Sequence, residues 1–289
     1  MRTSPECLSC LRRQAKAAIG MASQDAATQR QVESAALHYL DRLDMSLSPP
    51  ENATGLYQLI ATASGCRDPF AAIKEAENRL ALQWRDSIRQ RILASQDPLR
   101  TACAYAVAGN IIDHGANHAF DAVAALDNCL ERPFAIDDLE RLRTEAREAR
   151  KILYLADNCG EIVLDGLLAE LLARQSVVTL AVRGAAVIND ATRADAHVCG
   201  LDATLRIIDN GTACPGTPLG SCSKEFRQHF QEADLIISKG QGNFETLSEE
   251  GGPIYFLLTA KCAVVAGFLA GRSGKPVRIG DLILFRGAD

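Results

Sequence analysis

Residues 153–166, LYLADNCGEIVLDG, connect a mostly apolar run directly to a polar turn and then to a segment with helical character. In an open α/β sheet, the carboxyl ends of the strands face the crevice where ligands bind. Asp157 and Asn158 stand at such an end, and together they offer two hard oxygens of the kind that magnesium prefers. An Asp-Asn pair is also common in simple turns, because both side chains bond nearby backbone amides. The stretch therefore predicts an α/β sheet with a candidate cation site at one edge.

Short apolar runs recur after Lys151, with helix-like segments between most of them. Continuous apolar strands that alternate with helices are typical of a parallel sheet covered on both faces. We therefore predict a doubly wound, largely parallel α/β/α sheet core over residues 149–289. The expected strands are 152–156, 177–182, 205–208, 235–238, 254–258 and 282–285, and the expected helices are 161–174, about 191–196, 221–231 and 263–270.

The first half of the chain has a different pattern, with apolar residues at helical spacing. Asp68-Pro69 and Asp97-Pro98 each place an N-cap residue before a proline suited to the first helical position. We therefore expect residues 1–148 to form a helical N-terminal region that packs on the core.

Composition excludes some classes of protein. The chain has 289 residues, a net charge of −5 and 47% hydrophobic residues, with no basic block. A nucleic-acid partner therefore has little support. No apolar segment is long enough to span a membrane, and the first residues lack the apolar core of a signal peptide. We expect a cytoplasmic protein without membrane contact, whose ten cysteines are reduced or metal-bound. Its oligomeric state stays open.

Polar residues follow four of the predicted strands. Asp157-Asn158 follows the first strand, Arg183 and Asn189-Asp190 the second, Asp209-Asn210 the third, and Lys239-Gly-Gln-Gly-Asn243 the fourth. The ends of parallel strands share one edge, so these side chains are expected to converge. The glycines would let backbone amides approach an anion, although the same segment also suits a flexible turn with a solvated lysine.

The sequence resembles the metal-dependent damage-control phosphatases, known as domain of unknown function 89 or ARMT-like, and within them the prokaryotic branch. The resemblance spans nearly the whole chain. Its matching segments are Cys7-Leu-Ser-Cys10, AGNIIDHG (108–115), DNCGE (157–161), RGAAVINDATRAD (183–195) and KGQGNFETL (239–247).

The resemblance implies phosphomonoester hydrolysis that needs a divalent cation such as magnesium, manganese, cobalt or nickel. It places the metal ligands on Asp157, Asn158 and Asp190, and a phosphate-contacting lysine on Lys239. Either Asp157 or a metal-activated water would attack the phosphate. Further substrate contacts are expected at Asn110, Asp113, Arg183, Gly240, Gly242 and Asn243. Asn110 and Asp113 would equally suit a helix surface. Glu161 and Asn189 are expected to contact the side chains that bind the metal or the substrate, rather than the metal or the substrate itself.

These residues favour a phosphatase that acts on small phosphorylated metabolites, such as sugar phosphates, phosphopantetheine-like compounds or damaged phosphometabolites. One alternative is a metal- or metabolite-binding protein without turnover. Another is a protein carboxyl methyltransferase, an activity claimed for relatives, although Asp157–Glu161 lacks a glycine-rich loop for S-adenosylmethionine.

Cys7 and Cys10 have the spacing of a zinc or redox pair, but no second C-x-x-C completes a zinc site. Packing, an accessory metal site and redox chemistry all stay open. We expect the pair to lie outside the phosphatase centre.

Overall fold

The computed structural model describes residues 1–109, 130 and 132–288, and in this part of the chain seven strands form one sheet. Their order across the sheet is β1-β7-β6-β5-β2-β3-β4. The strands are β1 (Ile136–Asp137), β2 (Lys151–Leu155), β3 (Val177–Val182), β4 (Arg206–Asp209), β5 (Leu235–Lys239), β6 (Ile254–Thr259) and β7 (Leu282–Arg286). Each strand from β2 to β7 lies within a residue or so of its predicted range, which confirms the α/β class.

Most neighbouring strands are parallel, and β6 and β7 are the antiparallel pair. β2 lies between β5 and β3. The chain builds outward through β3 and β4 and then returns to the other side of β2 to form β5. The strand order therefore reverses between β2 and β5, which is where open α/β sheets bind their ligands.

Side chains of the central strands alternate between two hydrophobic clusters. In β2, Ile152 and Tyr154 face one cluster, while Leu153 and Leu155 face the other. Successive strand residues point to opposite faces, so an uninterrupted apolar run buries both faces at once. This is the physical reason why the apolar runs form a doubly covered sheet.

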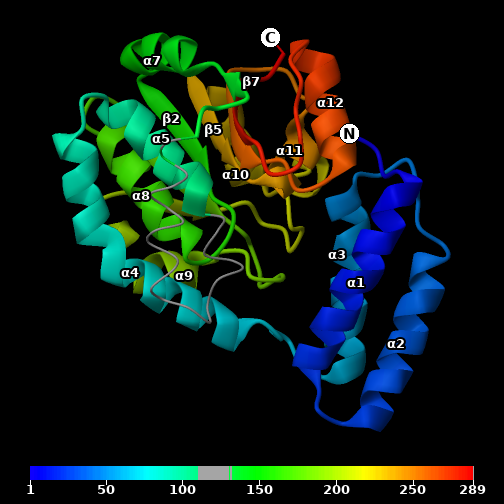
Figure 1. Ribbon diagram of the computed structural model, residues 1–289. Helices are drawn as coiled ribbons and strands as arrows, with labels where there is room; N and C mark the ends of the chain where they lie inside the picture. Colours follow the sequence, from blue (N-terminus) through cyan, green and yellow to red (C-terminus); the bar gives the residue numbers. More distant parts are fainter. Residues whose placement is uncertain (110–129, 131, 289) are drawn as a thin grey trace.

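Helices cover both faces (Figure 1). Residues of α4, α5, α7 and α8 belong to the first cluster, and residues of α10, α11 and α12 belong to the second. Their bounds are α4 (Ala71–Ala94), α5 (Pro98–Ala108), α7 (Leu139–Glu148), α8 (Glu161–Leu172), α9 (Arg193–Val198), α10 (Lys224–Glu232), α11 (Gln241–Leu247) and α12 (Ala263–Ser273).

The first three helices, α1 (Pro5–Ala22), α2 (Ala26–Leu40) and α3 (Pro49–Ser64), form a separate group beside the sheet (Figure 1). They have a hydrophobic cluster of their own, which includes Leu11, Val32 and Leu56. By contrast, α4 and α5 share the cluster of the sheet and α8. The helical N-terminal region therefore consists of a three-helix group followed by helices that cover the sheet. No helix in the described residues is long and apolar enough to cross a membrane.

Candidate active site

The polar residues that follow the strands meet at one edge of the sheet. Asp157 and Asn158 continue from β2, Arg183 from β3, and Lys239 ends β5. All four side chains are buried, with at most 7% of each residue exposed. Buried charged groups are rare unless they are paired, so this edge is a built polar site rather than a set of turns.

The guanidinium of Arg183 holds two carboxylates together. Its Nε donates to Asp190 Oδ2 at 2.5 Å, and its Nη2 donates to Asp157 Oδ1 at 3.0 Å. Nε and Nη2 lie on the same edge of the planar group, so both acids face that edge. Two acids separated by more than 30 residues are thereby brought side by side.

Burial and mutual repulsion disfavour the charged form of Asp157. Its pKa is raised well above the usual range, first by burial and then by Asp190, while Arg183 opposes the rise. The pKa of Arg183 is itself raised, because Asp190 and Asp157 together outweigh the effect of its burial. Two carboxylates therefore face a single guanidinium, and the excess of negative charge favours the binding of a further cation.

The chain returns to Asp157 through the loop before Asp190. Asn158 and Asp190 form an isolated antiparallel bridge, and the Ala191 amide donates to the Asp157 carbonyl at 2.8 Å. Ile188 has a φ of +37°, which is unusual for a β-branched residue. This strained backbone turns Asn189 and Asp190 toward the end of β2.

Lys239, the last residue of β5, is surrounded by buried hydrogen-bond acceptors. Its ammonium donates to the Ala106 carbonyl at 2.6 Å, to Glu161 Oε1 at 2.5 Å and to Asp165 Oδ1 at 2.7 Å. Burial would lower the pKa of Lys239, but Asp165 and Glu161 raise it. Burial raises the pKa of Asp165 to about 7 even though Lys239 opposes that shift. The lysine is therefore charged and fully enclosed.

The start of α11 packs closely against the site. Asn243 Oδ1 accepts from Arg183 Nη1 at 2.8 Å, and its Nδ2 donates to the carbonyls of Ala156 and Lys239. At Gly240 a Cβ would lie 1.8 Å from Asp157 Oδ2, and at Gly242 it would lie 2.0 Å from the Pro215 carbonyl oxygen. Both glycines allow close packing. The Gly240 amide donates to the Leu257 carbonyl, so it is already engaged.

Two residues of α4 support the loops from outside. Asn78 Oδ1 accepts from the Gly160 amide at 2.7 Å, and Glu77 Oε2 accepts from Asn189 Nδ2 at 3.2 Å. The supporting position expected for Asn189 thus has a partner on a helix 112 residues earlier. Nothing in the local sequence marks Asn78 or Glu77, because an amphipathic helix carries many such residues.

The donor set suits a hard divalent cation. Among the described residues, no group of three or more His, Cys, Asp or Glu side chains is arranged to hold a metal ion. The candidate set contains two acids, Asp157 and Asp190, and the amide of Asn158 is its third oxygen donor. Both Asn158 side-chain hydrogen bonds within the described residues are donated by Nδ2, which leaves the amide oxygen for a ligand. Magnesium and manganese prefer such oxygens.

The remaining predicted residues have different outcomes. Asn110 and Asp113 lie outside the described residues. Cys7 and Cys10 are partly exposed on α1, and Cys7 Sγ lies 3.4 Å from Ser4 Oγ. Burial raises the pKa of Cys10, and Cys7 and Cys262 also raise it. The separation of this pair from the phosphatase centre stays a prediction.

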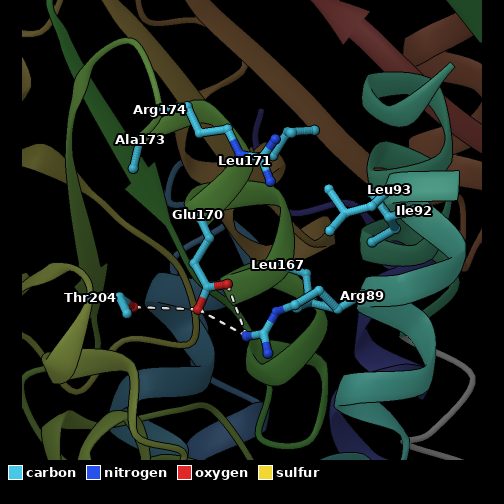
Figure 2. Close-up of a pocket in the computed structure, with 9 residues that line it drawn as sticks. All are labelled: Arg89, Ile92, Leu93, Leu167, Glu170, Leu171, Ala173, Arg174 and Thr204. Carbon is cyan, nitrogen blue, oxygen red and sulfur yellow. Dashed lines mark hydrogen bonds and ion pairs between the residues drawn. The ribbon is translucent and has the colours of Figure 1, made fainter.

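Two hollows adjoin the loop between Arg183 and Asp190. One, of about 490 Å³, is lined by residues that include Lys74, Arg183 and Asp195. The other, of about 220 Å³, includes Tyr57, Val187 and Ile188. A third cavity, of about 330 Å³, lies between α4 and α8 and shares none of the predicted site residues (Figure 2). There Glu170 forms an ion pair with Arg89.

The fold and this edge of the sheet define a family. The chain belongs to the damage-control phosphatase ARMT1-like domain family, whose model matches residues 3–277. A damage-control phosphatase of Pyrococcus horikoshii is 34% identical, covering 92% of this chain and 93% of the relative. A damage-control phosphatase of Archaeoglobus fulgidus is 33% identical over 80% of each chain. The crystal structure of a DUF89 family protein from Pyrococcus horikoshii has a TM-score of 0.92, with 33% identity and 99% of both chains covered. The relatives' names support a phosphatase of the metabolite-repair type.

Proposed function

We propose that this protein is a divalent-metal-dependent phosphatase that hydrolyses small phosphorylated metabolites. The observation that carries the proposal is the pairing of Asp157 and Asp190 on one edge of Arg183, at the point where the strand order reverses. The names of the relatives support the same reaction class.

The cation would be held by Asp157, Asn158 and Asp190, with magnesium, manganese, cobalt or nickel as candidates. When bound, it would withdraw charge from the phosphate and favour ionisation of a water. Arg183 keeps the two acids in register, and Asn243 in turn holds Arg183. In such a site catalysis is mainly positioning and electrostatic stabilisation.

The attacking group is either the Asp157 carboxylate or a water. Beyond the phosphate, the rest of the metabolite would extend into the two hollows beside residues 184–190. These hollows have both apolar and charged walls, which suits a polar metabolite of modest size.

The test is hydrolysis of p-nitrophenyl phosphate by purified protein that has been stripped with a chelator and supplied with each of the four metals. We expect turnover only with metal, and a loss of at least a hundredfold in kcat/KM in Asp157→Asn. Glu245→Gln is the matched control, because Glu245 is a buried acid whose side chain accepts from Gln241 rather than holding a predicted metal ligand. No turnover with any metal would contradict the proposal, and so would full activity in Asp157→Asn.

A further inference from the structure

Lys239 is a fully enclosed charge of the site. None of its surface is exposed, and its ammonium makes three hydrogen bonds, which equals its number of N–H donors. A phosphate oxygen would have to displace the Ala106 carbonyl or one of two carboxylates. The contacts of Lys239 therefore point toward its protein neighbours rather than toward a substrate.

Glu161 connects Lys239 to the candidate metal ligands. Its Oε1 accepts from Lys239 at 2.5 Å, and its Oε2 accepts from Asn158 Nδ2 at 3.2 Å. Among the described residues, these two contacts use one carboxylate oxygen each. The position of Lys239 thus fixes where Glu161 can accept from Asn158.

Asn158 lies between two carboxylates. Its Nδ2 also donates to Asp157 Oδ2 at 3.2 Å. In the ionised form that binds a cation, a carboxylate only accepts hydrogen bonds, so both neighbours then require the amide nitrogen on their side. The amide oxygen is consequently held on the opposite side, in the orientation that a metal ligand needs. Among the described residues, this network is what determines which way the Asn158 amide faces.

A second acid, Asp165, also accepts a hydrogen bond from Lys239. Asp165 Oδ1 accepts from Lys239 at 2.7 Å and from the Tyr154 hydroxyl at 2.9 Å, and Asp165 is fully buried. Tyr154 lies on β2, three residues before Asp157, so the network begins on that strand and ends just after it. Such outer partners typically change metal affinity by about 10- to 100-fold when they are lost.

We propose that Lys239 is a positioning residue for the metal site: with Asp165 it holds Glu161, and Glu161 turns the Asn158 amide oxygen toward the cation. This inference rests on the proposed function, since it assigns the lysine a role within that site. It predicts an effect on metal affinity in the absence of any phosphate.

The direction of the change in metal affinity separates a positioning role for Lys239 from a purely electrostatic role and from a phosphate contact. Removing a buried positive charge would, by electrostatics alone, tighten the binding of a cation. Removing a phosphate contact would raise KM and leave metal affinity unchanged. Loss of a positioning residue would weaken metal binding despite the favourable change in charge.

The experiment measures the Kd of Mn²⁺ for metal-free protein by counting free Mn²⁺ with electron paramagnetic resonance, without substrate. We expect Lys239→Met to weaken Mn²⁺ binding at least tenfold. Lys151→Met is the control, because Lys151 forms an exposed ion pair with Glu232, and its Kd should stay within about twofold of wild type. Thermal unfolding checks that each variant is folded. Equal or tighter Mn²⁺ binding in folded Lys239→Met would overturn the inference.

Asn158→Asp tests the same network without removing a buried lysine, and it decides the matter if Lys239→Met does not fold. It adds a carboxylate to the metal site, so charge alone predicts tighter binding. The network predicts binding at least tenfold weaker, because the new side chain has no hydrogen to offer Asp157 or Glu161. Equal or tighter binding would overturn the inference.

Hydrolysis of p-nitrophenyl phosphate by the wild type distinguishes a failure of the positioning role from a failure of the proposed function. If the wild type binds Mn²⁺ and hydrolyses the ester while both variants keep their affinity, only the positioning role is wrong. If the wild type neither binds nor hydrolyses, the proposed function and this inference fail together.

Discussion

At the scale of single residues, Gly240 shows how little space surrounds Asp157. Its φ is +81°, and a Cβ there would lie 1.8 Å from Asp157 Oδ2. Its ψ is 165°, a region where a side chain costs roughly 1 to 3 kcal/mol. We predict that Gly240→Ala is destabilised by more than this cost and also binds Mn²⁺ more weakly, because Asp157 must move. Gly274→Ala is the control, since Gly274 has a φ of +68° but a Cβ there would meet no neighbouring atom within 4 Å. Equal unfolding free energies for the two variants would contradict this prediction.

Glu245, which is not a candidate metal ligand, should make the stability of the folded protein depend on pH. Burial raises its pKa from 4.5 to about 7, although Gln241, the N-terminal amine and Lys261 act in the opposite direction. A carboxyl group with a raised folded-state pKa contributes stability that is complete below its unfolded pKa. That contribution is lost as the pH rises through about 7.

Between pH 4 and pH 8 we therefore expect the wild type to lose about 3 kcal/mol of stability relative to Glu245→Gln. Urea unfolding of both proteins across this range measures the difference. A pH-independent difference would show that Glu245 titrates normally in the folded protein.

Single residues also show what the sequence could and could not predict. Asp157 and Asn158 were identifiable as candidate site residues because they come just after an apolar run. Asp190 was identifiable because it lies in the segment after the next strand, and parallel strands end at a common edge. The contact of Arg183 with both acids was not, because the direction of a side chain depends on packing. The same limit applies to Asp165, which lies inside an apolar helical segment and gives no signal of its contact with Lys239.

At the scale of elements, strands were predicted more accurately than short helices. The expected strands from β2 to β7 correspond closely to the observed ones, because a strand buried on both faces must be continuously apolar. Residues 239–242 suited either an anion-binding glycine loop or a flexible turn, but the helix α11 begins within them, at Gln241. Glycine is a poor helix former, and here close packing against residues 215–217 outweighs that preference. The reversed direction of β7 was also not visible, since an apolar run carries no information about direction.

The helices of the first half divide according to what they bury. α4 shares the cluster of the sheet and sends Glu77 and Asn78 to the site loops. Helical periodicity identified α4 as amphipathic but could not show which surface it covers. The three-helix group and the sheet-covering helices have the same kind of pattern, so only long-range contacts separate them.

At the scale of the whole molecule, metal binding and folding should be coupled. A ligand that binds only the folded state at 100 times its Kd stabilises that state by about 2.7 kcal/mol. For a chain of this size we expect Mn²⁺ at that concentration to raise the Tm by roughly 5 °C or more. Asp190→Asn keeps an acceptor for Arg183 but removes a charge from the metal site, so its Tm should rise much less.

Differential scanning calorimetry with Mn²⁺ and with a chelator measures both shifts. Ca²⁺ at the same concentration serves as a comparison, because its larger coordination shell suits a site with two acids and one amide less well. An equal shift in wild type and Asp190→Asn would place the bound metal elsewhere.

The pairing of β7 also has a consequence for folding during synthesis on the ribosome. Ile136 in β1 pairs with Ile283 in β7, and β7 is the strand that joins β1 to the rest of the sheet. The ribosome synthesises β1 (Ile136–Asp137) well before β7 (Leu282–Arg286). At 5 to 20 residues per second, the interval is on the order of ten seconds. Throughout that time β1 lacks its β7 neighbour, and β6, once it is made, also lacks that neighbour until Leu282–Arg286 are synthesised.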